Sequence, residues 1–420
     1  MNVLHVMPDF PLPADNGARA DVWSRIVAMK SLGYVIDVLV IGQRVRPTLT
    51  SMTQLRRVVD SLHFVQRLPL LNCLATREPT YISRNARLSE YPLTKQYDVT
   101  IMEAEDTIGV MENPTLRTSL KVLRVHNDEI TYLREFLKVE ENFAKRQFLR
   151  LELLRLKPFL HSAHQRVDQL WFISESEWQD FVTTHPNATC KAVWLPPSIE
   201  IRKTPNRKDP DNKRVLFVGN LYTPLNRDAL RWYLKQVHPV LLREPDYEFV
   251  IAGSTQSREP ARLFAEELKR QPRCDVHVDI EDPTPLYDSC AVFVNPMRGG
   301  AGVKLKSIHA IERLIPVVST SIGNEGTGFH DAEHLKIADS SEQFVVAVTE
   351  LLNDRRLRTA LAERAYHRLV ARYDAVANIG KLMDSTVGCR AWAELAAERS
   401  DEMSIEKLLT STATIRPSRD

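Results

Sequence analysis

Residues 292–306 decide the fold, and they read Val292-Phe293-Val294-Asn295-Pro296-Met297-Arg298-Gly299-Gly300-Ala301-Gly302-Val303-Lys304-Leu305-Lys306. An apolar run, a glycine-rich loop and the start of a helical spacing follow one another, as in a strand–loop–helix unit. In an open parallel sheet such a loop lies at the carboxyl edge, where ligands bind. Glycine lets the backbone approach a ligand, and a lysine beside a helix start is unfavourable unless an anion binds there. The loop predicts a diphosphate site, with two simply solvated lysines as the alternative.

The alternation of strands and helices extends in both directions from this loop. Strands are predicted at 3–7, 35–41, 171–174, 215–218, 249–253, 276–278, 291–295 and 316–319, and helices at 22–32, 228–242 and 305–314. Such alternation is typical of parallel α/β sheets. The polar, proline-bearing stretch 196–213 is unfit for burial and predicts a linker. We therefore expect an α/β protein with one domain at 1–195, a second at 214–387, and a poorly ordered tail at 388–420.

Composition limits the classes of function. The 420 residues carry 56 Lys and Arg against 54 Asp and Glu, so a net charge of +2 gives no general case for nucleic-acid binding. The five cysteines include no CxxC pair, so neither a zinc knuckle nor a disulfide framework is expected. The N-terminus lacks the pattern of a signal peptide, and no apolar run reaches the length of a membrane span. These features predict a cytoplasmic protein.

Several binding motifs are missing from the sequence. It contains neither the phosphate-binding GxxxxGK[ST] nor the dinucleotide fingerprint GxGxxG, and no HExxH or EF-hand loop marks a metal site. The histidines at 161 and 164, and those at 330 and 334, have suitable spacing, but we assign them no metal role without further ligands. We therefore expect neither a metal nor a cofactor.

Two further loops would lie at the carboxyl edges of their sheets. Asn16 and Gly17 follow the first strand and precede a helix, where exposed amides suit an anion, although a plain tight turn is equally consistent. Gly219 and Asn220 follow the strand at 215–218, and Arg227 lies at the start of the next helix. Arg227 is either a ligand contact or a surface charge, so this loop alone is a weak signal.

The stretch from about 131 to 166 is long and helix-prone, and its part 143–166 predicts a basic amphipathic helix. Its cations are Lys145, Arg146, Arg150, Arg155, Lys157 and Arg166, against the single acid Glu152. Leu153, Leu156 and Leu160 contribute to an apolar stripe. We interpret the segment as a solvated helix that packs on its domain through this apolar stripe. Contact with an anionic membrane, peripheral at its inner face, is the alternative.

Three segments together resemble the GT-B glycosyltransferases, most closely retaining family 4 in its subgroup with a glycine-rich loop. The segments are the proline- and glycine-rich loop 10–19, the start of the second domain at 215–229, and the run from Pro296 to Gly326. The third segment is the specific one, and the likeness extends to about residue 385.

The resemblance implies two Rossmann-like domains that face each other across a cleft, with a nucleotide diphosphate sugar held mainly by the second. The diphosphate would meet Gly219, Asn220, Arg227, Gly300, Gly302, Lys304 and Lys306, and the segment around Glu325 would close the site. Asn16 and Gly17 would face the acceptor. His126 falls where the family often has an acceptor-side polar residue and is our candidate catalytic residue, with a structural histidine as the alternative.

The sequence departs from the family at two positions. The family commonly has two glutamates eight positions apart, and here Ala301 and His309 occupy those positions. The second glutamate holds the ribose hydroxyls. On a helix, Glu312 would share a face with His309, so the pair is a candidate substitute, with an ion pair to Arg313 as the alternative for Glu312.

The prediction is a retaining glycosyltransferase that moves a sugar from a nucleotide diphosphate donor to a glycan or lipid-linked acceptor in surface polysaccharide or glycoconjugate synthesis. The alternatives are a non-catalytic module that binds sugar nucleotides or glycans, which the departures at Ala301 and His309 favour, and a GT-B-type sugar-nucleotide epimerase.

Overall fold

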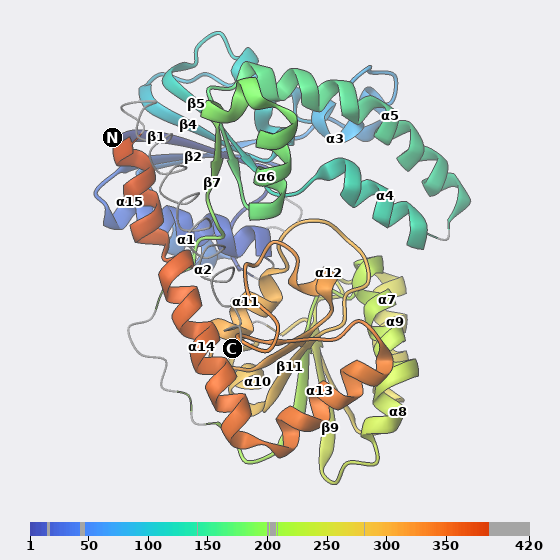
Figure 1. The fold of residues 1–420 in the computed structure, drawn as a ribbon. Helices are drawn as coiled ribbons and strands as arrows, with labels where there is room; N and C mark the ends of the chain where they lie inside the picture. Colours follow the sequence, from blue (N-terminus) through green and yellow to red (C-terminus); the bar gives the residue numbers. More distant parts are fainter. Residues whose placement is uncertain are drawn as a thin grey trace, which may run out of the picture.

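The computed structural model describes residues 1–14, 17–42, 47–140, 142–199, 201, 207, 209–280 and 282–385, which fold into two α/β domains built on parallel sheets (Figure 1). The elements of the N-terminal domain are β1 (Asn2–Met7), α1 (Gly17–Ser31), β2 (Val35–Ile41), α2 (Leu49–Arg56), β3 (Ser61–Val65), η1 (Leu70–Cys73), α3 (Thr80–Ser83), η2 (Ala86–Ser89), β4 (Gln96–Glu103), η3 (Glu105–Glu112), β5 (Arg117–Val125), α4 (Glu129–Val139), α5 (Phe143–Arg166), β6 (Gln169–Phe172), α6 (Glu175–Thr184), η4 (Pro186–Lys191) and β7 (Ala192–Trp194).

The second domain follows the linker. Its elements are β8 (Lys213–Val218), α7 (Pro224–Trp232), the π-helical turn η5 (Tyr233–Val237), α8 (His238–Leu241), β9 (Tyr247–Gly253), α9 (Glu259–Lys269), β10 (Cys274–Val278), α10 (Thr284–Ser289), β11 (Val292–Asn295), α11 (Leu305–Glu312), β12 (Val317–Ser319), α12 (Ser321–Asn324), β13 (Lys336–Ile337), α13 (Ser341–Asn353) and α14 (Arg355–Tyr373), after which comes α15 (Ala375–Ser385). The predicted α/β class and the two parallel-sheet domains are confirmed.

The strand orders create one switch point in each sheet. The seven-stranded sheet has the order β3-β2-β1-β4-β5-β6-β7, and the six-stranded sheet has the order β10-β9-β8-β11-β12-β13. The chain therefore reverses its direction of growth between β1 and β4, and again between β8 and β11. Ligands of open α/β sheets bind beyond the carboxyl ends of the strands at such points.

Both sheets are covered by helices on their two faces, which explains the continuous apolar runs of the strands. In β1, Val3 and Met7 belong to one apolar cluster, whereas Leu4 and Val6 belong to the cluster on the opposite face. In the second domain, Val215 and Phe217 of β8 pack on one face and Leu216 on the other.

The last described helix returns to the N-terminal domain. α14 runs along both domains and α15 lies beside α1 (Figure 1). Ile379 and Leu382 of α15 belong to the same buried cluster as Val22 and Ile26 of α1. The predicted second domain, 214–387, is therefore wrong at its C-terminal end, because the apolar face of α15 completes the core of the first. The predicted tail, 388–420, lies outside the described residues.

The predicted helices differ from the observed ones in two places. The helix expected at 228–242 starts earlier, at Pro224, and contains the wider turn η5 just before Pro239. Proline has no N–H to donate and its ring crowds the preceding turn, so a regular helix cannot continue through it. The helix-prone stretch before residue 166 forms two helices, α4 and α5, and α5 has the expected bounds 143–166.

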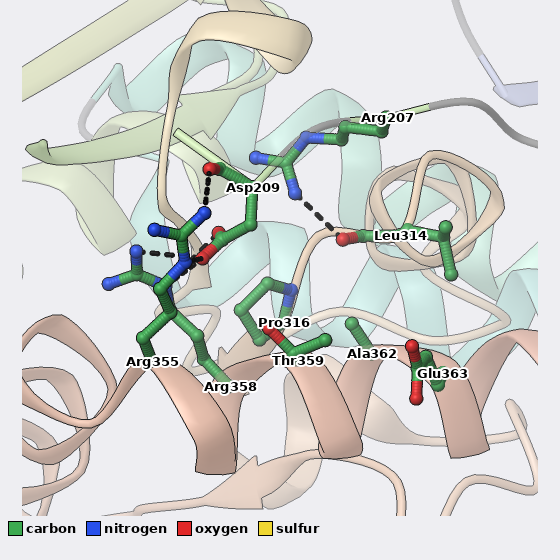
Figure 2. A pocket seen from close by; sticks show the side chains of 9 residues that line it. All are labelled: Arg207, Asp209, Leu314, Pro316, Arg355, Arg358, Thr359, Ala362 and Glu363. Atoms are coloured by element: carbon green, nitrogen blue, oxygen red, sulfur yellow. Dashed lines mark hydrogen bonds and ion pairs between the residues drawn. The ribbon is translucent and has the colours of Figure 1, made fainter. Parts of the chain in front are cut away.

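The described part of the linker forms hydrogen bonds and ion pairs with α14. The Asp209 carboxylate accepts hydrogen bonds from Arg358 and forms an ion pair with Arg355 at 3.1 Å (Figure 2). Arg207 donates to the carbonyl of Leu314 at 2.7 Å. These residues border a cavity of about 300 Å³. Because Leu314 precedes β12, the cavity lies at the amino edge of the sheet, away from the switch point.

Candidate active site

The two domains approach each other through glycines of the predicted loops. A Cβ atom on Gly302 would lie 2.2 Å from Oδ1 of Asn127, and Gly302 has φ +74°, so only glycine fits there without strain. A Cβ atom on Gly17, at the start of α1, would lie 2.8 Å from Cδ1 of Leu305, at the start of α11. The glycine-rich loop therefore faces the carboxyl edge of the N-terminal sheet.

Helix α4 forms a second contact between the domains. Tyr132 and Val139 pack on a small apolar cluster of Leu225, Ala229 and Met297 from the second domain. Figure 1 shows α4 between α5 and α7. This packing holds the loop that follows β5, with His126 and Asn127, opposite the glycine-rich loop.

Lys304 lies within the glycine-rich loop and its ammonium group is held by that loop. Its Nζ donates to the carbonyls of Gly302 at 2.7 Å and Ala301 at 3.2 Å, and lies 3.8 Å from a carboxylate oxygen of Glu325. Burial lowers the pKa of Lys304, against the attraction of Glu325. Backbone carbonyls of its own loop therefore hold this ammonium group more closely than the Glu325 carboxylate does.

Lys306 connects the glycine-rich loop to the turn after β8. Its Nζ donates to Oδ1 of Asn226 at 2.7 Å and lies 4.7 Å from the centre of the Phe217 ring. Asn226 in turn donates to the carbonyl of Asn220 at 3.0 Å. Burial, reinforced by repulsion from Lys304, lowers the pKa of Lys306 to about 7. The structure thus brings Lys306, Gly219 and Asn220 together at the switch point.

Arg227 and Asn220 bond mainly within their own loop. Arg227 donates to the carbonyls of Leu221 at 3.2 Å and Tyr222 at 3.3 Å, while Asn220 Nδ2 donates to the Tyr222 hydroxyl at 3.0 Å. Both side chains therefore shape the turn after β8. A direct contact of either residue with a ligand stays a prediction.

His309 and Glu312 lie on one face of α11, as helix geometry predicts. Nδ1 of His309 lies 3.4 Å from a carboxylate oxygen of Glu312. The two side chains are 29% and 16% exposed, so the histidine edge remains open to a ligand. If Nδ1 of His309 carries the ring proton, it donates a hydrogen bond to Glu312, and Nε2 can then accept a hydrogen bond from a hydroxyl group.

On the N-terminal side, His126 is positioned by Glu103, at the end of β4. Glu103 accepts from Nε2 of His126 at 2.8 Å and from Arg25 at 2.6 Å, and it also contacts His5. Burial opposes the charge of Glu103, but Arg25 and the two histidines outweigh it, so its pKa lies well below the ordinary value. The charged carboxylate fixes the ring of His126, with Nε2 toward Glu103 and Nδ1 on the opposite edge of the ring.

A second buried carboxylate completes this network. Asp21 of α1 accepts from Arg25 at 2.9 Å, from Arg124 at 3.2 Å and from the amide of Ser198 at 2.6 Å. Burial alone would raise the pKa of Asp21, but the attraction to Arg124 and Arg25 is the larger effect, so this pKa lies below its ordinary value. The network ties β1, α1, β4 and β5 together beneath His126.

Two carboxyl groups at helix starts have raised pKa values. Burial, with repulsion from Glu105, raises the pKa of Glu129 to about 8. Burial also raises the pKa of Glu177 to about 7, although Glu177 accepts from the amide of Asp128 at 3.0 Å. Glu177 interacts electrostatically with both Lys304 and Glu325 across the domain interface. Glu177 thus places an acidic side chain of the N-terminal domain near Lys304 and Glu325 of the second domain.

Sequence reasoning missed Glu103, Glu177 and the linking role of Asn226. Glu103 was detectable as a carboxylate at the end of the alternating run 96–103, but its partner His5 lies 98 positions away. Asn226 lies 80 positions from Lys306. Asn16 lies outside the described residues, and Gly17 is placed at the interface as described above.

Two groups among the described residues have three metal-ligating atoms within 4.8 Å of one another: Asp21, Glu103 and His126; and His330, Glu333 and His334. In the first group, Asp21 and Glu103 both already accept hydrogen bonds from Arg25. In the second, Nδ1 of His334 accepts the amide of His330 at 3.1 Å, which leaves the proton on Nε2, the atom that faces Glu333. Neither group offers a ready site.

Comparison with known proteins agrees with this architecture. Two parallel sheets whose switch points face each other define the GT-B class. Solved structures of similar fold include S. aureus TarM, in complex with Fondaparinux, alpha-GlcNAc-glycerol and UDP (TM-score 0.65, 10% identity, 91% of this chain and 99% of that chain). Sucrose-phosphate synthase from Thermosynechococcus elongatus matches with TM-score 0.65 and 12% identity over 92% of this chain and 99% of that one. Anabaena HepE, in complex with UDP and glucose, matches with TM-score 0.62 and 11% identity over the same shares.

Sequence comparison gives the family. The model of the glycosyl transferases group 1 matches residues 212–354. An uncharacterized 44.6 kDa protein in the cps region of Klebsiella pneumoniae is 31% identical over 388 residues, which cover 89% of this chain and 96% of that protein. The chain belongs to the glycosyl transferases group 1, and the predicted GT-B glycosyltransferase is confirmed. No helix of the described part of the chain has the length and apolarity to cross a membrane.

Proposed function

We propose that this chain is a retaining glycosyltransferase that transfers a sugar from a nucleoside diphosphate donor to a glycan or lipid-linked acceptor in surface polysaccharide or glycoconjugate synthesis. The observation that carries the proposal is the position of Lys304 and Lys306 at the switch point of the second domain, opposite His126. Because TarM and HepE are solved with UDP, uridine diphosphate sugars are the first donors to test. The cps-region relative supports a polysaccharide product.

On the donor side, the leaving diphosphate needs neutralisation as the glycosidic bond breaks. Lys304 exchanges its bonds to loop carbonyls for phosphate oxygens, and Lys306 gains a counter-charge and with it a proton. Groups that are already placed where charge develops stabilise a transition state more than mobile water does. Two ammonium groups and the amides at the start of α11 suffice for this role, so we propose that transfer requires no divalent metal.

The ribose is held by His309 and Glu312 in this proposal. Glu312 fixes the tautomer of His309, so that Nε2 accepts a hydroxyl hydrogen bond from the ribose. The test compares Glu312→Gln and His309→Ala for affinity towards UDP and its dideoxyribose analogue. A smaller preference for UDP in either variant supports the assignment, and an unchanged preference in both would place the ribose elsewhere.

On the acceptor side, His126 and the start of α1 at Gly17 face the donor loop. Glu103 holds His126 through Nε2, which leaves Nδ1 to accept or orient an acceptor hydroxyl. Retention of configuration lets the donor phosphate itself take the acceptor proton, so His126 acts by binding and orientation. Replacing His126 with Ala then lowers kcat without abolishing donor binding.

The test of the proposed function is nucleotide binding followed by product analysis. Nucleotide sugars are screened by thermal stabilisation, for which a ligand at about 100 times its Kd adds roughly 2.7 kcal/mol. The Lys304→Ala, Lys306→Ala double variant is the matched control and loses this stabilisation. Equal stabilisation of parent and double variant would refute the donor site.

The products distinguish transfer from the two alternatives. A glycosylated acceptor with release of UDP supports the transferase. An altered sugar on intact donor identifies an epimerase. Donor binding with no turnover on any acceptor identifies a binding module, which the replacement of the family glutamates by Ala301 and His309 would then explain.

A further inference from the structure

Two segments of the N-terminal domain expose large apolar side chains. On the solvent face of α5, Phe143 and Leu154 are 75% and 76% exposed, and Leu151 is also exposed. In and beside η1, Leu71 is 80% exposed and Leu70 and Leu74 are exposed as well. The face of α5 that packs on the domain is a different one, because Leu156 and Leu160 are buried. The apolar stripe predicted from the sequence therefore does not account for these exposed side chains.

The two segments lie side by side although they are distant in sequence. Arg155 of α5 donates to the carbonyl of Leu74 at 2.9 Å, and it lies four positions from Leu151 and one from Leu154. Glu152 accepts the amide of Thr80 at 2.6 Å, which fixes the next part of the chain against the same helix. These two neighbouring segments carry six exposed apolar side chains, which we name together the leucine face: Leu70, Leu71, Leu74, Phe143, Leu151 and Leu154.

Exposed cations outnumber exposed acids around the leucine face, where Glu78 is an exposed acid beside Arg77. Arg150 and Lys157 of α5 are exposed beside it, and Arg77 is exposed next to η1. The one acid of α5, Glu152, is buried and bound to Arg155 and Thr80, so it does not offset these cations at the surface. Apolar side chains bordered by more cations than acids match the boundary of an anionic bilayer, where the apolar chains enter the acyl region and the cations meet headgroups.

We propose that the leucine face docks the protein on an anionic lipid bilayer through α5 and the 70–74 segment. Charge complementarity selects this partner over a neutral surface. The inference goes beyond the proposed function, because binding needs neither donor nor acceptor. It gives that function a place: a protein docked in this way acts beside lipid-linked acceptors.

The experiment is flotation of the full chain with vesicles of equal parts phosphatidylglycerol and phosphatidylcholine, compared with pure phosphatidylcholine vesicles. The parent floats with the anionic vesicles. A Leu71→Glu, Leu154→Glu variant loses at least about tenfold in partitioning, since two apolar side chains that would enter the bilayer become charged. An Arg150→Gln, Lys157→Gln variant loses roughly fivefold per charge on anionic vesicles only. Thermal unfolding and UDP binding show that each variant is folded.

The matched control is Leu263→Glu, Val346→Glu, on α9 and α13 of the second domain, because both side chains are 65% exposed. This variant floats like the parent. Absence of parent binding to anionic vesicles, or an equal loss in the control, would overturn the proposal. So would a dimer that the Leu71→Glu, Leu154→Glu variant dissociates while the parent ignores vesicles, because the leucine face would then join two copies.

Discussion

Donor binding should take up a proton at Lys306. Its ammonium group has a pKa of about 7 in the ligand-free protein, because burial and Lys304 disfavour the charge. A bound diphosphate supplies a counter-charge at the same place and returns the pKa toward its ordinary value. At pH 8 about nine-tenths of Lys306 is neutral before binding, so binding takes up nearly one proton.

The sign of the pH dependence follows from this shift. The charged lysine binds the anion, so affinity is greatest below the free pKa and falls as pH rises through it. From pH 7 to pH 8 the charged fraction falls from about one half to about one tenth, so affinity for UDP falls about fivefold, and it falls about tenfold further by pH 9. The diphosphate is at least about nine-tenths ionised over this range, since its last ionisation lies near pH 6.

Calorimetry in two buffers of different ionisation enthalpy measures the proton directly. The parent takes up close to one proton at pH 8, whereas Lys306→Met binds more weakly and takes up much less. Glu177 is the control, because its raised pKa of about 7 lies near the same lysines and it could also gain a proton. Glu177→Gln keeps the uptake. Unchanged uptake in Lys306→Met, or none in the parent, would refute the assignment of Lys306 to the diphosphate.

Three further predictions concern the site. Lys304→Ala weakens UDP binding roughly 10–150-fold, the value of one hydrogen bond to a charged group, with an unchanged fold by circular dichroism; unchanged affinity contradicts a phosphate contact. Transfer persists in EDTA, and complete loss that Mg²⁺ or Mn²⁺ restores would show that a metal takes part. Glu103→Gln lowers the free energy of unfolding by about 3–5 kcal/mol in urea titrations, because Arg25 and the neighbouring histidines lose a buried counter-charge; a loss below about 1 kcal/mol would show that the network carries little stability.

Local sequence patterns were enough to predict the elements whose form depends on neighbouring residues. The apolar runs of β1, β8 and β11 are continuous because helices cover both faces of each strand, and the glycines of the donor loop follow directly. The end of α5 at Arg166 and the shared face of His309 and Glu312 also agree with helix spacing, whereas the break between α4 and α5 was not apparent from it.

Contacts between distant positions could not be predicted from the sequence. The bond between Asn226 and Lys306, which accompanies the low pKa of Lys306, depends on how two strands pair. The network of Glu103 and His5 arises for the same reason. The return of α15 to the first domain depends on which core leaves a gap for its apolar face, and a single amphipathic helix does not specify that choice.

The most direct test of the central claim is a transfer assay with isotopically labelled UDP-sugars and a bacterial glycolipid extract, with products identified by mass spectrometry. We predict that the parent attaches labelled sugar to an acceptor and releases UDP in equal amount, and that the Lys304→Ala, Lys306→Ala variant does neither. Labelled product from the double variant at the parent's rate would contradict the account, because the sugar would then be transferred without the site at the end of β11.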